Sequence, residues 1–134
     1  MNSALECFVT DTMALVLWIE KRKMPATVKS LFTKAENNLV KLYIPGMVLA
    51  EIGYLSERNR IDITLTDVSV QLKKYNNVVV HPMDLEVVRT AFEIKDIAEL
   101  HDRLIAATGR LLAYPVITND PVIIASEFVS TVWG

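Results

Sequence analysis

Two hydrophobic patterns alternate along this chain, and their alternation limits the folds that it can adopt. Short runs rich in β-branched residues recur between longer stretches in which apolar residues follow a helical repeat. The strand-like runs cover residues 7–10, 41–44, 78–81 and 115–118, with a possible fifth at 130–133. Strands separated by helices are joined by right-handed crossovers, which leave them parallel in one sheet. We therefore predict an α/β fold, with three layers in the order α/β/α and a central, mainly parallel sheet of four or five strands.

The helical stretches have boundaries that their own residues mark. We expect helices over residues 12–23, 26–36, 45–57, 64–75, 84–94 and 102–113. Pro25 separates the first two, Pro45 suits the first turn of the third, and Thr64 and Asp84 are suitable N-caps for the next two. A chain of 134 residues, 51% of them hydrophobic, is long enough for one well-buried core and too short for two ordinary domains. We predict a single domain over residues 1–134.

Composition excludes several classes of protein. The formal net charge of −2 gives no basic footprint of the kind that marks many nucleic-acid binders, so any such function must come from a local site. The single cysteine, Cys7, excludes an internal disulfide and fits a reducing compartment. The N-terminal residues lack a basic leader, and the apolar run Met13–Ile19 is far shorter than the roughly 20 residues of a membrane span. We expect a soluble, cytoplasmic protein.

Four acidic residues are placed where this architecture would bring them together. Asp11 directly follows the first strand and Asp120 follows the fourth by two residues. Both belong at the carboxyl edge of the sheet, where open α/β sheets bind ligands. Glu51 lies on the helix after the second strand, at the border of its apolar stripe, and Asp102 lies in the first turn of its own helix. The sequence therefore predicts four carboxylates at one edge, although each acid alone could be a helix cap or a surface charge.

Clustered carboxylates need a compensating positive charge. Like charges in a half-buried cleft raise one another's pKa and destabilise the fold, and a divalent cation offsets them more fully than a lysine or arginine. A site of carboxylate and water ligands suits Mg²⁺ or Mn²⁺. Zinc is disfavoured because His81, His101 and Cys7 share no ligand spacing. We predict a magnesium or manganese site formed by the four acids.

Four segments of the chain resemble the signature blocks of a known family. The segments VTDTMAL, VLAEIGYL, HDRLIAATG and VITND, in this order and spacing, are similar to those of the PIN-domain family, especially its small ribonucleases of VapC type. The resemblance covers essentially the whole chain and implies a PIN-like fold. It also implies that the metal-binding, catalytic acids are Asp11, Glu51, Asp102 and Asp120. The family's supporting hydroxyl residues correspond to Thr12 and Thr118, and Glu99 stands near a further acid found in many relatives.

The activity that this resemblance implies is metal-dependent hydrolysis of RNA phosphodiester bonds, by an endoribonuclease that serves as the toxin of a toxin–antitoxin pair. Phosphate contacts would come from Arg103, from Arg58 and Arg60, or from the basic segment 21–23, although Arg103 could equally form a structural ion pair. The alternative is a catalytically silent PIN-like module that binds RNA or metal. A receiver-like signalling domain is excluded, because Asp11 stands alone after the first strand and no lysine follows the fourth.

The apolar content also suggests protein partners. The helices expected at 12–23 and 26–36 carry more apolar side chains than one sheet face covers, namely Leu17, Trp18, Val28, Leu31 and Phe32. We expect these helices to form a groove for an amphipathic antitoxin helix, and another apolar face to form a homodimer. Trp18 and Trp133 could stack on RNA bases, or could belong to the core or to an interface.

Overall fold

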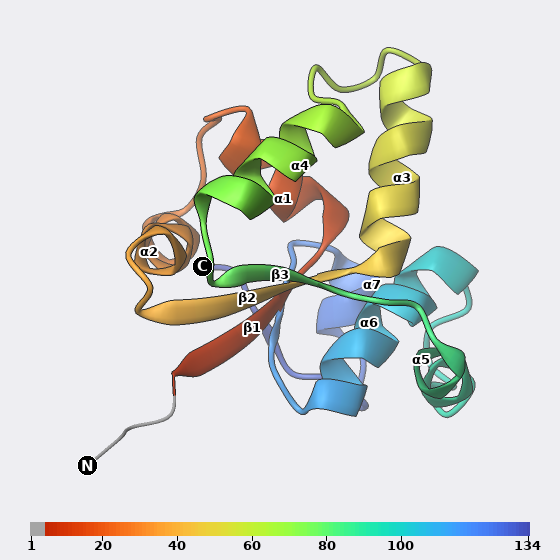
Figure 1. The fold of residues 1–134 in the computed structure, drawn as a ribbon. Coiled ribbons are helices and arrows are strands. Elements are labelled where there is room, and N and C mark those ends of the chain that lie inside the picture. The colour runs from red at the N-terminus through yellow and green to blue at the C-terminus, as the bar shows by residue number, and fades with distance from the viewer. Residues whose placement is uncertain (1–4) are drawn as a thin grey trace.

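The computed structural model describes residues 5–134, in which helices alternate with the strands of one sheet (Figure 1). In chain order the elements are β1 (Glu6–Thr10), α1 (Thr12–Ile19), α2 (Ala26–Glu36), β2 (Val40–Pro45), α3 (Gly46–Glu57), α4 (Leu65–Lys74), β3 (Val78–His81), α5 (Leu85–Ala91), α6 (Leu100–Leu112), β4 (Val116–Ile117), α7 (Pro121–Ile124) and β5 (Thr131–Val132). The N-terminal residues 1–4, on which the expected absence of a leader partly depends, lie outside the described residues. The possible fifth strand of the sequence prediction is present as β5.

The sheet has the strand order β3-β2-β1-β4-β5, and each neighbouring pair is parallel. β1 is the central strand, and its last three residues are buried because helices cover both of its faces. Its register pairs Phe8 with Leu42 of β2 and Thr10 with Ile117 of β4. The carboxyl ends of β1, β2 and β4 therefore share one edge. These observations confirm the predicted three-layer α/β/α fold with a parallel sheet.

One apolar cluster is buried between the sheet and the helices, and a second one is buried mainly among α5, α6 and α7. In Figure 1, α1, α3 and α4 lie on one side of the sheet and α5, α6 and α7 on the other. Leu15, Ile44 and Ile52 belong to the first cluster, whereas Ile97 and Ile123 belong to the second. Each of these five side chains is almost completely removed from solvent, which fixes the helices, and hence their N-termini, relative to the strands.

Several helix boundaries differ from the sequence prediction by one to four residues: α5, for example, ends at Ala91 and not at residue 94. Two of these differences bear on the site. α1 ends at Ile19 instead of residue 23, because Lys21 adopts a left-handed backbone conformation with φ of 56°. The basic segment 21–23 thus follows the helix and does not form its last turn. α6 begins at Leu100, two residues earlier than predicted, because the carboxylate of Glu99 caps it. No helix within residues 5–134 is long and apolar enough to cross a lipid bilayer.

Candidate active site

Asp11 occupies the junction between the central strand and the first helix. Its Oδ1 accepts a hydrogen bond of 2.8 Å from the backbone N–H of Ala14, so the carboxylate is the N-cap of α1. Its own N–H donates to the carbonyl of Ile117 at 3.1 Å, which ties it to β4. The side chain is only 8% exposed. A buried carboxylate is thereby held at the carboxyl edge of the sheet.

Asp120 reaches the same edge from β4. Thr118, which is completely buried, accepts a hydrogen bond of 3.0 Å from the Asp120 N–H through its hydroxyl oxygen. The Asp120 Oδ1 accepts from the Val122 N–H at 2.8 Å and caps the short helix α7. Because Thr10 of β1 pairs with Ile117, the chain that leaves β4 brings Asp120 beside Asp11.

Glu51 enters the site from α3. The Thr12 hydroxyl, in the first turn of α1, donates a hydrogen bond of 2.5 Å to the Glu51 Oε1. This contact joins two residues 39 positions apart and depends on the packing of α1 against α3. Thr12 itself is buried, and the Glu51 side chain is 25% exposed. The hydroxyl that follows Asp11 thus fixes the orientation of a second acid.

Asp102 is presented by the first turn of α6. Glu99 caps this helix, and its two carboxylate oxygens accept from the N–H groups of His101 at 3.1 Å and Asp102 at 2.8 Å. The His101 Nδ1 lies 3.6 Å from the Glu99 Oε1 and 3.8 Å from the Glu51 Oε2. The structure places His101 between two acids from different elements, which its position alone could not indicate.

All four acids line one cleft of about 160 Å³. The other residues that line it are Thr12, Met13, Leu55, Ile105 and Ile123. The carboxylates therefore face one another across a small space with apolar walls. The catalytic and metal-binding roles that the sequence assigned to these acids stay a prediction.

The electrostatics of this cleft follow from burial and repulsion. Burial raises the pKa of the Asp11 carboxyl, and repulsion from Asp120 and Glu51 adds to this effect, although hydrogen bonds from Thr118 and Ala14 oppose it. Burial also raises the pKa of Asp102 to about 6, with further contributions from Asp120, Glu99 and Glu51. Desolvation alone would raise the Glu99 pKa, but its backbone hydrogen bonds from Asp102 and His101, together with the charge of His101, lower it. The cleft concentrates negative charge that its own residues do not neutralise.

The donor set fits a hard divalent cation that keeps part of its water shell. All four side chains offer carboxylate oxygens, and Mg²⁺ in proteins is commonly bound by one or two carboxylates plus waters. Among residues 5–134, no three acidic, histidine or cysteine side chains stand close enough together to be a preformed metal site. The residues that would hold such an ion are Asp11, Glu51, Asp102 and Asp120.

The structure turns one predicted substrate contact away from the cleft. The Arg103 Nε donates to the carbonyl of Ile97 at 2.6 Å, and its guanidinium lies over the ring of Phe92. The side chain is held at the connection between α5 and α6, which gives Arg103 a structural role through a carbonyl and an aromatic ring and not through the ion pair that the sequence suggested. Adjacency to Asp102 in sequence did not predict this, because successive residues of a helix point about 100° apart.

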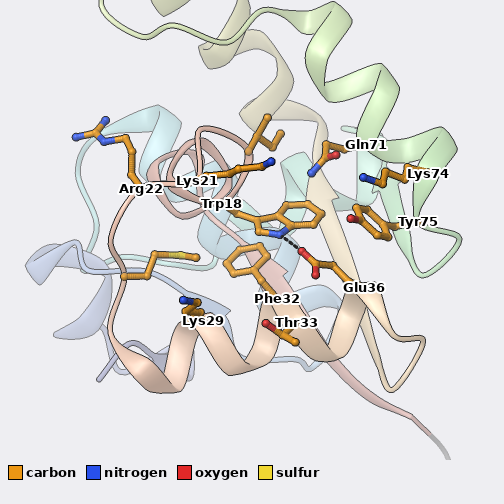
Figure 2. Close-up of a pocket in the computed structure, with 12 residues that line it drawn as sticks. Trp18, Lys21, Arg22, Lys29, Phe32, Thr33, Glu36, Gln71, Lys74 and Tyr75 are labelled. Carbon is orange, nitrogen blue, oxygen red and sulfur yellow. Dashed lines mark hydrogen bonds between the residues drawn. The ribbon is translucent and has the colours of Figure 1, made fainter.

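The expected antitoxin groove also differs from the sequence prediction. Val28 and Phe32 are completely or almost completely buried, and Trp18 is 7% exposed, so they are core residues and not surplus surface. A cleft of about 300 Å³ does lie between α1, α2 and α4, with these aromatic rings at its base (Figure 2). Its other lining residues include Lys21, Arg22, Lys29, Lys74 and Glu36. The groove therefore has an aromatic base and a cationic rim.

Comparison with known proteins identifies the class of protein. The model of the PIN domain family matches residues 8–127, and the chain belongs to this family. Its fold is similar to those of VapC-type toxins in solved structures. A comparison with curated protein sequences gives no match.

Three solved structures illustrate the likeness. One is the VapBC2 complex of Rickettsia felis bound to promoter DNA, with a TM-score of 0.72, 16% identity, and 96% of this chain and 99% of that chain covered. DNA-bound VapBC from Salmonella typhimurium gives a TM-score of 0.70 at 16% identity, covering 96% and 98%. VapC20 of Mycobacterium tuberculosis, described as a toxin that cleaves the sarcin-ricin loop, gives 0.64 at 16%, covering 95% and 99%. At this identity the likeness concerns the fold.

Proposed function

We propose that this chain is a metal-dependent endoribonuclease that hydrolyses RNA phosphodiester bonds and acts as the toxin of a toxin–antitoxin pair. The observation that carries the proposal is the single cleft lined by Asp11, Glu51, Asp102 and Asp120, in which repulsion and burial raise two carboxyl pKa values. Membership of the PIN family and the likeness to VapC20 support the same conclusion. A cytoplasmic location fits the composition.

The four acids would hold Mg²⁺ or Mn²⁺ at this cleft. When bound, a divalent ion supplies Lewis acidity toward the phosphodiester and offsets the repulsion between an anionic substrate and the acids. Thr12 orients Glu51, and Thr118 supports both Asp11 and Asp120 through its hydroxyl. Leu55, Ile105 and Ile123 exclude bulk water from one side of the cleft. Glu99 acts mainly through the helix that presents Asp102.

The test of the enzymatic proposal is cleavage of RNA by purified protein. Transfer RNA and other structured RNAs are incubated with the protein and Mn²⁺, and in parallel with excess EDTA. We expect internal cleavage in the first reaction and none in the second. Retention of RNA in a binding assay without cleavage at any metal concentration would favour the alternative, a silent PIN-like module.

We propose that the antitoxin docks in the cleft between α1, α2 and α4. Two of the similar structures are toxin–antitoxin complexes, which supports a partner of this kind. The partly exposed side chains of Ile19, Met24 and Tyr75, which also line the cleft, suit the apolar face of an amphipathic helix. The cationic rim of the cleft suits acidic residues beside that face. An arginine or lysine carried by the same segment and directed at the four acids would replace the cation electrostatically.

We also propose a homodimer formed through an apolar surface away from this cleft. Four large apolar side chains are exposed on and around α5 and the start of α6: Met83, Leu85, Phe92 and Leu100, each with 46% or more of its surface accessible. Burial of such side chains between two copies stabilises a dimer by the hydrophobic effect. Light scattering, alone and with the co-expressed product of a neighbouring gene, measures both associations. A monomer at high concentration, with no co-purifying neighbour, would contradict both partner proposals.

A further inference from the structure

The carboxylate cleft continues into a further cleft on each side. On one side, a cleft of about 390 Å³ shares Asp11, Met13 and Asp120 with it. On the other side, a cleft of about 420 Å³ shares Glu51 and Leu55. The strand order supports this arrangement, because β5 and the strand before α3 lie on opposite sides of β1. The acids thus lie in the middle of a continuous trough.

An exposed aromatic ring stands in the trough on the side of α3. Tyr54 is 54% exposed and lines the cleft with Met47, Ala50 and, from α6, His101. The Arg58 guanidinium lies over the Tyr54 ring, 4.4 Å from its centroid. A planar ring and an apolar floor are therefore presented beside Glu51, and the Arg58 cation lies against one face of the ring. Planar bases and an anionic backbone are the chemical groups that such a surface recognises.

A second aromatic ring stands in the trough on the side of β5. Trp133 is partly exposed and lines the cleft with Leu17 and Asn119, next to Asp11 and Asp120. Trp18 differs in this respect, since its ring is stacked on Phe32 at 5.0 Å and tilted against Tyr75 at 5.6 Å, as Figure 2 shows. Its faces are covered by the protein itself. Within the described residues, Tyr54 and Trp133 are the aromatic residues that line the trough.

We infer that Tyr54 and Trp133 are base-stacking residues that hold an unpaired RNA strand across the carboxylates. This inference rests on the proposed ribonuclease function and extends it to the form of the substrate. One base stacks on Tyr54 and another, on the far side of the scissile phosphate, on Trp133, while Arg58 neutralises backbone charge. Bases are free to stack on side chains only when they are unpaired. The trough therefore selects single-stranded segments, with little dependence on base identity, because every base has a π-face.

The fluorescence of Trp133 tests whether an RNA base stacks on its ring. Trp18→Phe leaves Trp133 as the single tryptophan of the chain, and Asp11→Asn prevents cleavage. This protein is titrated, with Mg²⁺, with an unstructured twelve-nucleotide RNA and with the same RNA annealed to its complement. We expect the single strand to quench the Trp133 emission and the duplex to leave it unchanged. Binding of the single strand without any change in Trp133 emission would overturn the inference for this residue.

The contribution of Tyr54 is tested by affinity. We expect Tyr54→Ala to weaken binding of the single strand by about 5- to 150-fold, and Tyr54→Phe, which keeps the ring, to bind like the parent. The KM for cleavage by the active protein should rise in parallel, with kcat less affected. Thermal melting of each variant verifies that it is folded.

The outcomes of these experiments separate the two proposals. Cleavage of RNA with unchanged affinity and KM in Tyr54→Ala would contradict the stacking role and leave the ribonuclease function intact. Tighter binding of duplex than of single strand would have the same consequence. Failure of the wild-type protein both to bind and to cleave RNA with Mn²⁺ would overturn both proposals. Light scattering of the variants tests one further outcome. If the wild-type protein is a dimer and the Tyr54 or Trp133 variants are monomers, these side chains belong to a dimer interface, and the stacking role is contradicted.

Discussion

At the scale of single residues, Asp11 has two functions in the same side chain. It caps α1 through the Ala14 N–H, and it places a buried negative charge within reach of Asp120 and Glu51. The first function needs an acceptor oxygen and the second needs the charge. Asparagine separates them, because its Oδ1 can accept the same hydrogen bond and asparagine is as good an N-cap as aspartate.

Asp11→Asn should therefore abolish RNA cleavage and preserve the fold. We expect activity with Mn²⁺ to fall on the order of 100-fold or more, since loss of a metal ligand is at least as damaging as loss of a group that orients one. The melting temperature of the metal-free protein should stay the same or rise, because repulsion within the cleft decreases. Circular dichroism melts and gel assays of RNA cleavage measure the two effects. Full activity in this variant would remove Asp11 from the site.

Thr12 acts on the site through Glu51. Thr12→Val keeps the side-chain shape and removes the hydroxyl that donates to the Glu51 Oε1. We expect metal affinity or activity to fall about 10- to 100-fold, as is common for groups that orient metal ligands. Thr108→Val is the matched control, because Thr108 is also buried but donates to the Leu104 carbonyl within α6. Equal losses in the two variants would indicate a general effect on folding.

The raised pKa of Asp102 has a consequence for stability. Between the ordinary aspartate pKa of 3.8 and the folded value of about 6, the folded protein binds a proton that the unfolded chain has released. Stability of the metal-free protein should therefore increase as the pH is lowered from 7 to 5. Asp102→Asn should flatten this dependence over the same range. Denaturant melts at several pH values, with EDTA present, measure it, and an Asp102→Asn protein with the wild-type slope would contradict the assignment.

At the scale of secondary structure elements, the site depends on helix N-termini. α1, α6 and α7 begin at the carboxyl edge of the sheet, and their caps are Asp11, Glu99 and Asp120. Acids near these termini are favoured by the helix dipole, which offsets part of the repulsion among them. Asp11 and Asp120 therefore serve both as helix N-caps and as acids of the candidate site.

Variants of Glu99 test whether this residue only caps α6 or also binds the metal. Glu99→Ala should destabilise the protein by about 0.5–2 kcal/mol, the usual cost of a lost N-cap. Glu99→Gln keeps acceptor capacity and removes the charge, so we expect it to retain both stability and RNA cleavage. Thermal melts and cleavage rates of the two variants decide the matter. A large loss of cleavage in a stable Glu99→Gln protein would place Glu99 among the metal-binding acids.

The sequence predicted most elements because their hydrophobic periods are distinct. The strand-like runs and the helical stretches all occur, and the helix over 26–36 has the predicted bounds. α7 was not predicted, because a helix of four residues has no period to detect. The early end of α1 was missed because the left-handed conformation of Lys21, a non-glycine residue, leaves no signal in the sequence.

The part of the candidate site that depends on the order and direction of the strands could be predicted from the sequence. The acids that follow β1 and β4 had to share an edge once the sheet was known to be parallel. The direction of Arg103, the position of His101 near Glu51 and the burial of Phe32 depend on side-chain packing between elements distant in sequence. A single sequence contains the residue types for such contacts but not their partners.

At the scale of the whole molecule, the protein separates charge into two regions. Four carboxylates line the cleft at the carboxyl edge, and four cations with one carboxylate line the cleft of Figure 2. The two regions are joined by α1, which is capped by Asp11 at its start and carries Trp18 in its last turn, shortly before Lys21. A partner segment that crosses α1 would meet both, which is why one antitoxin could cover the groove and neutralise the acids.

The central claim is that the four-acid cleft hydrolyses RNA with a divalent metal. The most direct measurement compares internal cleavage of a structured RNA by the wild-type protein and by Asp11→Asn, each with Mn²⁺ and with excess EDTA. We predict cleavage by the wild-type protein with Mn²⁺ and none in the other three reactions. Cleavage that persists in EDTA or in folded Asp11→Asn, or a wild-type protein that never cleaves, would contradict the claim.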